Sequence, residues 1–148
     1  MTRIVVDTSV LIRYLIRPSA AIRALIEVYW LDDEIQVVTA PELIEELEGV
    51  LSRDYIQELV QPEEGQALLD AILLKDAILL KAEILPSLGA VPAYTRDPKD
   101  DKFIACALVG DARYVVTVDK DLLALETLEH IRIVTPEELI GKIGHRSA

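Results

Sequence analysis

The stretch IVVDTSVL (Ile4–Leu11) decides the fold that this chain is expected to adopt. Its first three residues are β-branched or apolar, which is typical of a buried strand, and Asp7 ends the apolar run. Thr8 or Ser9 can cap the helix that begins with Val10. Ligands bind beyond the carboxyl ends of the strands in an open parallel sheet, so Asp7 is a candidate for chemistry.

The length of 148 residues predicts a single domain, which we place at residues 1–144, with a frayed tail at 145–148. The single cysteine, Cys106, excludes an intrachain disulfide and a multi-cysteine metal site, and its apolar neighbours indicate a packed thiol in a reducing compartment. Asp7 interrupts the first apolar run too early for a signal peptide, and no run approaches the ~18 residues of a membrane span. We therefore expect a cytoplasmic protein that does not enter a membrane.

The net charge is −11, with 26 acidic and 15 basic residues. This balance disfavours a protein that coats DNA or RNA through basic patches. It does not exclude a nuclease whose acids surround cations, because a bound metal ion reverses the local sign of the field.

Apolar strands alternate with helical segments along the chain. Strands are predicted at Ile4–Val6, Ile35–Val38, Ala77–Glu83, Tyr114–Val118 and Ile131–Val134. Helices are predicted from Val10, from Ser19 to Trp30, from Pro41 to Leu51, from Pro62, from Asp97 to Gly110, at Leu122–Leu125 and from Pro136. This order predicts an α/β fold with a parallel sheet of four or five strands and right-handed crossovers.

Two local patterns affect these boundaries. Residues Thr39–Glu42 have the spacing of a capping box, with proline near the first helical position. The sequence DAILLK occurs twice in direct succession, at Asp70–Lys75 and Asp76–Lys81. A continuous helix would spread the apolar residues of both copies around its circumference, so we expect the helix to end and a strand to begin within the second copy.

Two aspartates, Asp7 and Asp119, directly follow β-branched runs. Because parallel strands end at the same edge of a sheet, these carboxylates are expected to lie together. The structural alternative for each is an ordinary turn or helix-cap aspartate.

The helix Pro41–Leu51 offers several glutamates. At ~100° per residue, Glu46 borders the buried apolar stripe, whereas Glu45 and Glu48 point away from it. Glu42 lies a little further out on the side of Glu46. A carboxylate beside the stripe can enter a cleft between helix and sheet, so Glu46 is the predicted site residue and Glu42 is the alternative.

The run Asp97-Pro98-Lys99-Asp100-Asp101 begins the next helix with acids. Asp100 shares the face of Phe103 and Ile104 and is expected to point inward, whereas Asp101 is rotated off that face. A helix amino terminus stabilises an ionised carboxylate, which is the form that binds a cation. The alternative is that Asp97 and Pro98 form an ordinary helix-capping pair.

Four carboxylates gathered in one cleft would repel each other by several kcal/mol at short range. The repulsion calls for a cation, and hard oxygen donors favour Mg²⁺ or Mn²⁺ over zinc. His130 and His145 have no ligand spacing and are interpreted as surface residues.

At this point the motifs resemble those of the PIN-domain nucleases, and in particular the VapC-like toxins of bacterial and archaeal toxin–antitoxin pairs. The matching stretches occur in the family's order, within a resemblance that extends from Arg3 to about Leu139. They are Val6–Ser9, Leu43–Leu51, Arg96–Phe103 and Thr117–Leu123.

The resemblance implies a three-layer α/β/α sandwich that cleaves single-stranded RNA with Mg²⁺ or Mn²⁺. The family's acidic site falls on four residues, with Glu46 completing the site or orienting water, and the products would carry a 5′-phosphate and a 3′-hydroxyl. The four are Asp7, Glu46, Asp100 and Asp119. Supporting positions are Ser9, Asp101, Thr117 and Asp121.

The resemblance also implies partners: an RNA substrate, a cognate antitoxin protein and a second copy of the chain in a homodimer. Basic residues near the motifs are candidates for contact with the RNA backbone, and a solvated surface role is the alternative for each. They are Arg13, Arg17, Arg96, Lys99, Lys102 and Lys120.

Two other functions remain as alternatives. A phosphatase of the haloacid-dehalogenase type also begins with a strand-end acid, but it needs an aspartate where Ser9 stands. A non-catalytic PIN-like module would bind RNA or an antitoxin without cleavage, and the intact set of four acids argues against it.

Overall fold

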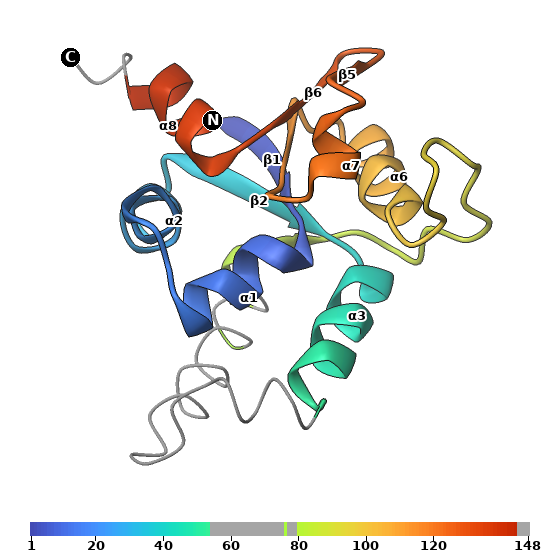
Figure 1. Cartoon of the computed structure of the whole chain (residues 1–148), viewed down its shortest axis with the longest axis horizontal. Helices are drawn as coiled ribbons and strands as arrows, with labels where there is room; N and C mark the ends of the chain where they lie inside the picture. The colour runs from blue at the N-terminus through green and yellow to red at the C-terminus, as the bar shows by residue number, and fades with distance from the viewer. Residues whose placement is uncertain (54–75, 77–79, 145–148) are drawn as a thin grey trace.

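The computed structural model describes residues 1–53, 76 and 80–144, and within these ranges six strands form one sheet in the order β3-β2-β1-β4-β6-β5 (Figure 1). Neighbouring strands from β3 to β6 are parallel, and β5 is antiparallel to β6. The α/β fold with a parallel sheet is therefore confirmed, with β5 added at one edge. The strands are β1 (Thr2–Val6), β2 (Ile35–Thr39), β3 (Glu83–Ile84), β4 (Tyr114–Val116), β5 (Thr127–Leu128) and β6 (Ile131–Val134).

Helices follow the strands and cover the sheet. The described helices are α1 (Thr8–Ile16), α2 (Ala20–Ala24), the π-helix η1 (Leu25–Trp30), α3 (Pro41–Leu51), α6 (Asp101–Val109), α7 (Lys120–Leu123) and α8 (Pro136–Ile143). None of them is long and apolar enough to cross a membrane.

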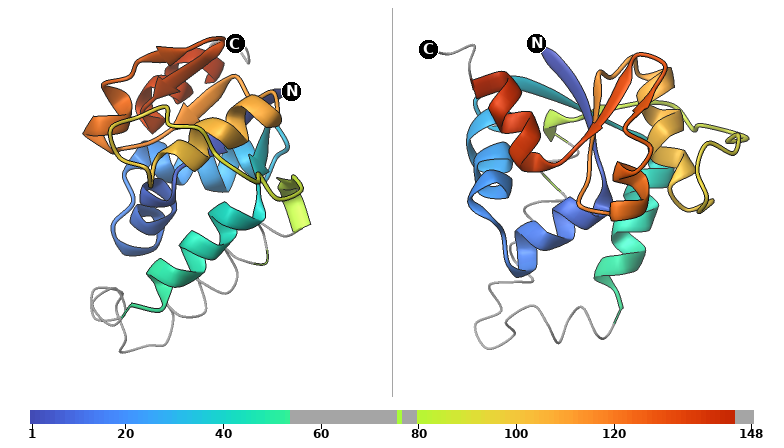
Figure 2. Two further views of the ribbon diagram at one scale, coloured as in Figure 1. Left: turned by 90° about the vertical axis from the view of Figure 1, so that its right-hand side faces the viewer. Right: turned by 45° about the horizontal axis from the view of Figure 1, so that its top comes forward.

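The sheet is buried on both faces because successive residues of a strand point to opposite sides. Ile4 and Val6 of β1 pack in the core that also contains residues of α1, α2, η1 and α8. Val5, between them, packs in a second core with Phe103 and other residues of α6. Helices therefore lie on both faces, as the two views of Figure 2 show, and the layers form an α/β/α sandwich. Burial on both faces explains why these strands are continuous apolar runs.

The second core includes Cys106, whose side chain is fully buried. Its thiol lies 3.9 Å from the carbonyl oxygen of Val38, and burial raises the pKa of the thiol to about 12. The prediction of a packed cysteine is confirmed.

The carboxyl ends of β1 and β4 lie side by side. Val6 is in register with Val116, and the backbone N–H of Asp7 donates to the carbonyl oxygen of Val116 at 2.9 Å. Helices α1 and α3, which follow β1 and β2, contact each other at this end of the sheet (Figure 1). This edge therefore collects the segments that carry the predicted acids.

Two predicted helix caps were wrong. Asp7, rather than Thr8 or Ser9, caps α1, because its carboxylate accepts a hydrogen bond from the backbone N–H of Ser9. The residues Thr39–Glu42 form no capping box, because Thr39 belongs to β2 and its carbonyl accepts from the N–H of Leu85 at 2.8 Å. Ala40 is the N-cap of α3.

The strand predicted at Ala77–Glu83 was also placed wrongly. Leu80 and Lys81 are helical, and β3 comprises only Glu83–Ile84, where it pairs with the end of β2. The side chain of Gln36 donates to the Lys81 carbonyl at 3.1 Å, so a side-chain contact replaces backbone strand pairing there. Residues 77–79, the helix predicted from Pro62, the first DAILLK copy and the tail at 145–148 lie outside the described residues.

Several other boundaries differ by a few residues. The strand predicted at Tyr114–Val118 ends at Val116, and the helix predicted at Leu122–Leu125 is α7 (Lys120–Leu123). Helix α6 begins at Asp101, because a turn over Asp97–Asp100 precedes it. The Asp97 carboxylate caps this turn, accepting from the N–H of Lys99 at 3.0 Å.

Candidate active site

Asp7 is held at the carboxyl end of β1 by two hydroxyl groups. Its Oδ2 accepts from Ser9 Oγ at 2.8 Å and from Thr117 Oγ1 at 2.6 Å. Burial raises the pKa of the Asp7 carboxyl, the hydrogen bonds from Thr117 and Ser9 oppose that increase, and the charge of Glu46 adds to it. The two hydroxyl residues that the resemblance placed beside the site therefore both contact this aspartate.

Glu46 connects three helices at the same edge. Its Oε2 accepts from Thr8 Oγ1 of α1 at 2.5 Å, and its Oε1 lies 2.7 Å from Lys102 Nζ of α6. The side chains of both members of the ion pair are about one-fifth exposed, at 22% for Glu46 and 23% for Lys102. Both carboxylate oxygens of Glu46 are therefore engaged within the protein.

Asp100 lies at the amino end of α6 with only 8% of its surface exposed. Burial is the main cause that raises its pKa to about 6, and the charges of nearby carboxylates contribute the rest. Those carboxylates are Asp119, Asp7, Asp97 and Glu46. The three other predicted site acids are thus close enough to Asp100 to disfavour its ionised form.

Asp119 follows β4 and caps α7, where its Oδ1 accepts from the backbone N–H of Asp121 at 2.9 Å. Its own N–H donates to Thr117 Oγ1 at 3.0 Å. Thr117 is fully buried and links Asp119 to Asp7, since the same hydroxyl donates to Asp7. The register of β1 and β4 therefore brings the two strand-end acids to one place.

These acids do not form a closed metal site. Across the part of the chain that the structure describes, no three Asp, Glu, His or Cys side chains are placed so that they could hold one metal ion together. The donors nevertheless suit Mg²⁺ or Mn²⁺ in kind, since they are carboxylate and hydroxyl oxygens. Each oxygen of Glu46 already has one contact, Oε1 with Lys102 and Oε2 with Thr8.

Asp101 departs from its predicted orientation. It was expected to be rotated off the packed face, but it is buried, and its Oδ1 accepts three hydrogen bonds from the preceding loop. The donors are the N–H of Tyr94 at 3.0 Å, the N–H of Thr95 at 2.8 Å and the Thr95 hydroxyl at 2.9 Å. Burial alone would raise the pKa of Asp101, but these hydrogen bonds outweigh burial and bring the pKa below its ordinary value. Asp101 therefore fixes the loop before α6.

Glu42, the alternative to Glu46, is turned to another segment. Its Oε2 accepts from Ser87 Oγ at 2.7 Å and from the N–H of Leu88 at 2.8 Å, and the Ser87 contact lowers its pKa. Glu45 and Glu48 are exposed. The structure thus places Glu46, and not Glu42, beside Asp7 and Asp100.

The basic residues divide into two groups. Lys102 is paired with Glu46, and the others near the motifs are exposed. The exposed ones are Arg13, Arg17, Arg96, Lys99 and Lys120. Their contact with RNA remains a prediction. His130 is exposed, as expected, with Nε2 3.5 Å from Asp111 Oδ1.

Sequence reasoning missed Thr8 as a partner of Glu46, and for Lys102 it considered contact with RNA or a solvated surface role but not an ion pair with Glu46. The signal for Thr8 was its position directly after Asp7, which places its hydroxyl at the same sheet edge. For the Lys102 contact the sequence holds no local signal, because it depends on how α3 packs against α6.

The fold and the acids define an α/β domain whose candidate site lies at the carboxyl ends of parallel strands. The family model of the PIN domain matches residues 3–121, and the chain belongs to the PIN-domain family. The matched range contains all four predicted acids. PIN domains have a nuclease-type fold and are generally metal-dependent. None of the curated proteins with which the chain was compared matches it.

Proposed function

We propose that this protein is a metal-dependent endoribonuclease that cleaves single-stranded RNA, and that it is the toxin of a toxin–antitoxin pair. The observation that carries the proposal is the convergence of acids at this edge, where the Thr117 hydroxyl contacts both Asp7 and Asp119. The charges of Asp119, Asp7 and Glu46 also help to raise the pKa of Asp100 to about 6, although burial is the main cause. This concentration of negative charge at the carboxyl edge of the sheet is what a divalent cation would relieve.

Asp7, Asp100 and Asp119 would hold one or two Mg²⁺ or Mn²⁺ ions, and Glu46 would complete the site or orient the attacking water. When bound, the metal lowers the pKa of water and stabilises charge on the phosphate, so that hydrolysis leaves a 5′-phosphate and a 3′-hydroxyl. Ser9 and Thr117 fix the Asp7 carboxylate, as hydrogen bonds to metal ligands commonly do.

Lys102 supplies a positive charge that contacts Glu46. With a cation bound at the acids, the ammonium group of Lys102 would be able to contact a phosphate of the substrate. The net charge of −11 gives RNA little general attraction to the surface, so binding depends on specific contacts, including those of a few basic side chains.

The toxin role, the antitoxin partner, the homodimer and the cytoplasmic location rest on the resemblance to VapC-like proteins. The acidic surface of this chain complements a basic partner. We expect a short basic protein to be encoded beside this one and to inhibit it by covering the acidic site.

The function is tested by incubating single-stranded RNA with the protein and Mn²⁺. The wild type should cleave, excess chelator should abolish cleavage, and Asp7→Asn should lower kcat by at least about 100-fold, as loss of a key electrostatic group does. Glu45→Gln, on the exposed face of α3, is the matched control and should retain full activity.

Two outcomes would replace the proposal. A folded wild type that binds RNA or the neighbouring protein and cleaves nothing is a non-catalytic module. Turnover of a phosphomonoester, with RNA left intact, identifies a phosphatase instead.

A further inference from the structure

A cavity of about 420 Å³ lies between the loop before α6 and helix α7. Both walls lead into the candidate active site: the loop continues to Asp100, and Asp119 caps α7. The lining residues are Tyr94, Thr95, Arg96, Asp121, Ala124 and Leu125. We call this cavity the base pocket.

Both walls of the base pocket are fixed by hydrogen bonds. Asp101 holds the backbone N–H groups of Tyr94 and Thr95, and the Thr95 hydroxyl also lies 2.7 Å from the carbonyl oxygen of Asp97. On the other wall, the N–H of Asp121 donates to Asp119. The cavity is therefore held by hydrogen bonds of Asp101 and Asp119, which lie next to or within the set of predicted site acids.

The lining residues carry an aromatic ring, a hydroxyl group, two aliphatic side chains, a guanidinium group and a carboxylate. Single-stranded RNA is recognised when unpaired bases stack on aromatic rings or guanidinium planes and form hydrogen bonds along their edges. The volume lies within the range of about 300–1,000 Å³ typical of small-molecule sites. We propose that the base pocket receives one unpaired base of the RNA, next to the phosphodiester that is cut. This proposal rests on the proposed function.

The carboxylate in the lining favours one base. The hydrogen bond that Asp121 makes to Asp119 uses its backbone N–H, not its side chain. A carboxylate has two acceptor oxygens, and guanine presents two adjacent donors, N1–H and N2–H, on its Watson–Crick edge. Adenine, cytosine and uracil present no such pair. Guanine is therefore the preferred base.

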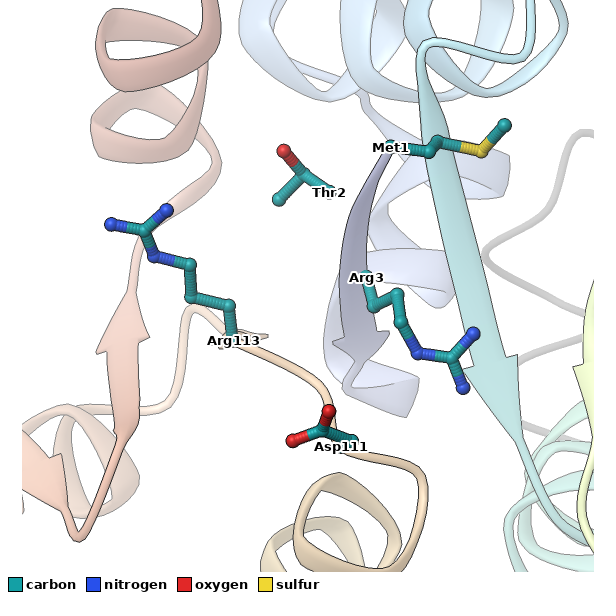
Figure 3. A pocket seen from close by; sticks show the side chains of 5 residues that line it. All are labelled: Met1, Thr2, Arg3, Asp111 and Arg113. Carbon is teal, nitrogen blue, oxygen red and sulfur yellow. The ribbon is translucent and has the colours of Figure 1, made fainter.

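A second cavity near charged side chains is a poorer candidate. It measures about 240 Å³ and lies at the start of β1, at the end of the sheet opposite Asp7 (Figure 3). The guanidinium of Arg3 donates to the Gly110 carbonyl and pairs with Glu83 at 2.6 Å. Figure 3 shows the side chains of Arg3 and Arg113 extending away from each other, so they do not form a two-armed anion clamp.

The test measures binding in excess chelator, where no cleavage is expected, to short oligouridine RNAs in which one nucleotide is replaced by guanosine, adenosine or cytidine. The guanosine RNA should bind at least about fivefold more tightly than the others. Asp121→Asn, which keeps the shape of the side chain, should abolish this preference. Ala124→Trp, which fills the cavity, should weaken binding about tenfold, and Val109→Trp at the exposed far end of α6 should leave it unchanged.

Equal binding of the three RNAs by the folded wild type overturns the proposal, as does a guanosine preference that both Asp121→Asn and Ala124→Trp leave intact. Cleavage with Mn²⁺ separates this proposal from the proposed function. Metal-dependent cleavage without any base preference supports the nuclease and overturns the base pocket. A guanosine preference in binding without any cleavage supports the base pocket and overturns the nuclease.

Discussion

The hydroxyl of Thr117 donates to Asp7 Oδ2 at 2.6 Å and accepts from the N–H of Asp119 at 3.0 Å. One buried side chain therefore orients two acids that follow neighbouring strands. Because β1 and β4 are paired in register up to Val6 and Val116, the contact follows directly from the sheet. The hydrogen bonds that orient Asp7 and Asp119 therefore lie directly beyond the paired ends of β1 and β4.

Replacing Thr117 by valine keeps the shape of the side chain and removes both hydrogen bonds. We expect Thr117→Val to lose about 1–3 kcal/mol of unfolding free energy, because a buried polar group is left unsatisfied. Metal-dependent activity should fall as well, since Asp7 is no longer held. Urea unfolding measures the first effect. Thr127→Val, at an exposed position of β5, is the control, and equal stability of the two variants would contradict the role given to Thr117.

Asp100 makes the stability of the metal-free protein depend on pH. Its pKa is about 6 in the folded protein, against an ordinary value of 3.8. Between these values the folded protein keeps a proton that the unfolded chain has lost, so the contribution of Asp100 to stability falls as pH rises through this window. Asp100→Asn should remove this part of the pH dependence. At pH values above this window, it should stabilise the metal-free protein.

The measurement is the urea midpoint below and above that window, in excess chelator. Asp32→Asn, a substitution of an exposed acid, serves as the reference for general charge effects. If the difference in urea midpoint between wild type and Asp100→Asn does not change with pH, the pKa shift assigned to Asp100 is contradicted.

We expect Lys102 to compete with a cation for Glu46. Removing its charge by Lys102→Met should therefore tighten Mn²⁺ binding by up to about fivefold, because partly exposed ion pairs contribute ~0.2–1 kcal/mol. The same change should lower the melting temperature of the metal-free protein, where Glu46 loses its partner. Calorimetric titration and thermal unfolding measure the two effects. Lys99→Met, at an exposed position, should change neither; weaker Mn²⁺ binding by Lys102→Met would contradict the competition.

Much of this site was predictable because strand ends and helix faces are local properties. The β-branched runs before Asp7 and Asp119 indicate strands, and parallel strands end together, so their proximity follows from the pattern. Helical periodicity likewise separates Glu46 from Glu45. Whether these acids act in catalysis remains a prediction.

Other features depend on packing between distant segments. The partners of Asp101 lie in a loop without periodicity, and the contact between Lys102 and Glu46 arises where α6 meets α3. Strand β3 is short because it pairs only with the end of β2, and β5 comprises only Thr127–Leu128. Segments this short leave no alternating pattern in the sequence.

The central claim is that carboxylates from separate parts of the chain share a divalent cation. Calorimetric titration of Mn²⁺ into the wild type and into folded Asp119→Asn tests it most directly. The account predicts that the wild type binds Mn²⁺ and that the substitution weakens binding by at least about tenfold, or 1.4 kcal/mol. Equal affinity of the two proteins, or no binding by the wild type, would contradict it.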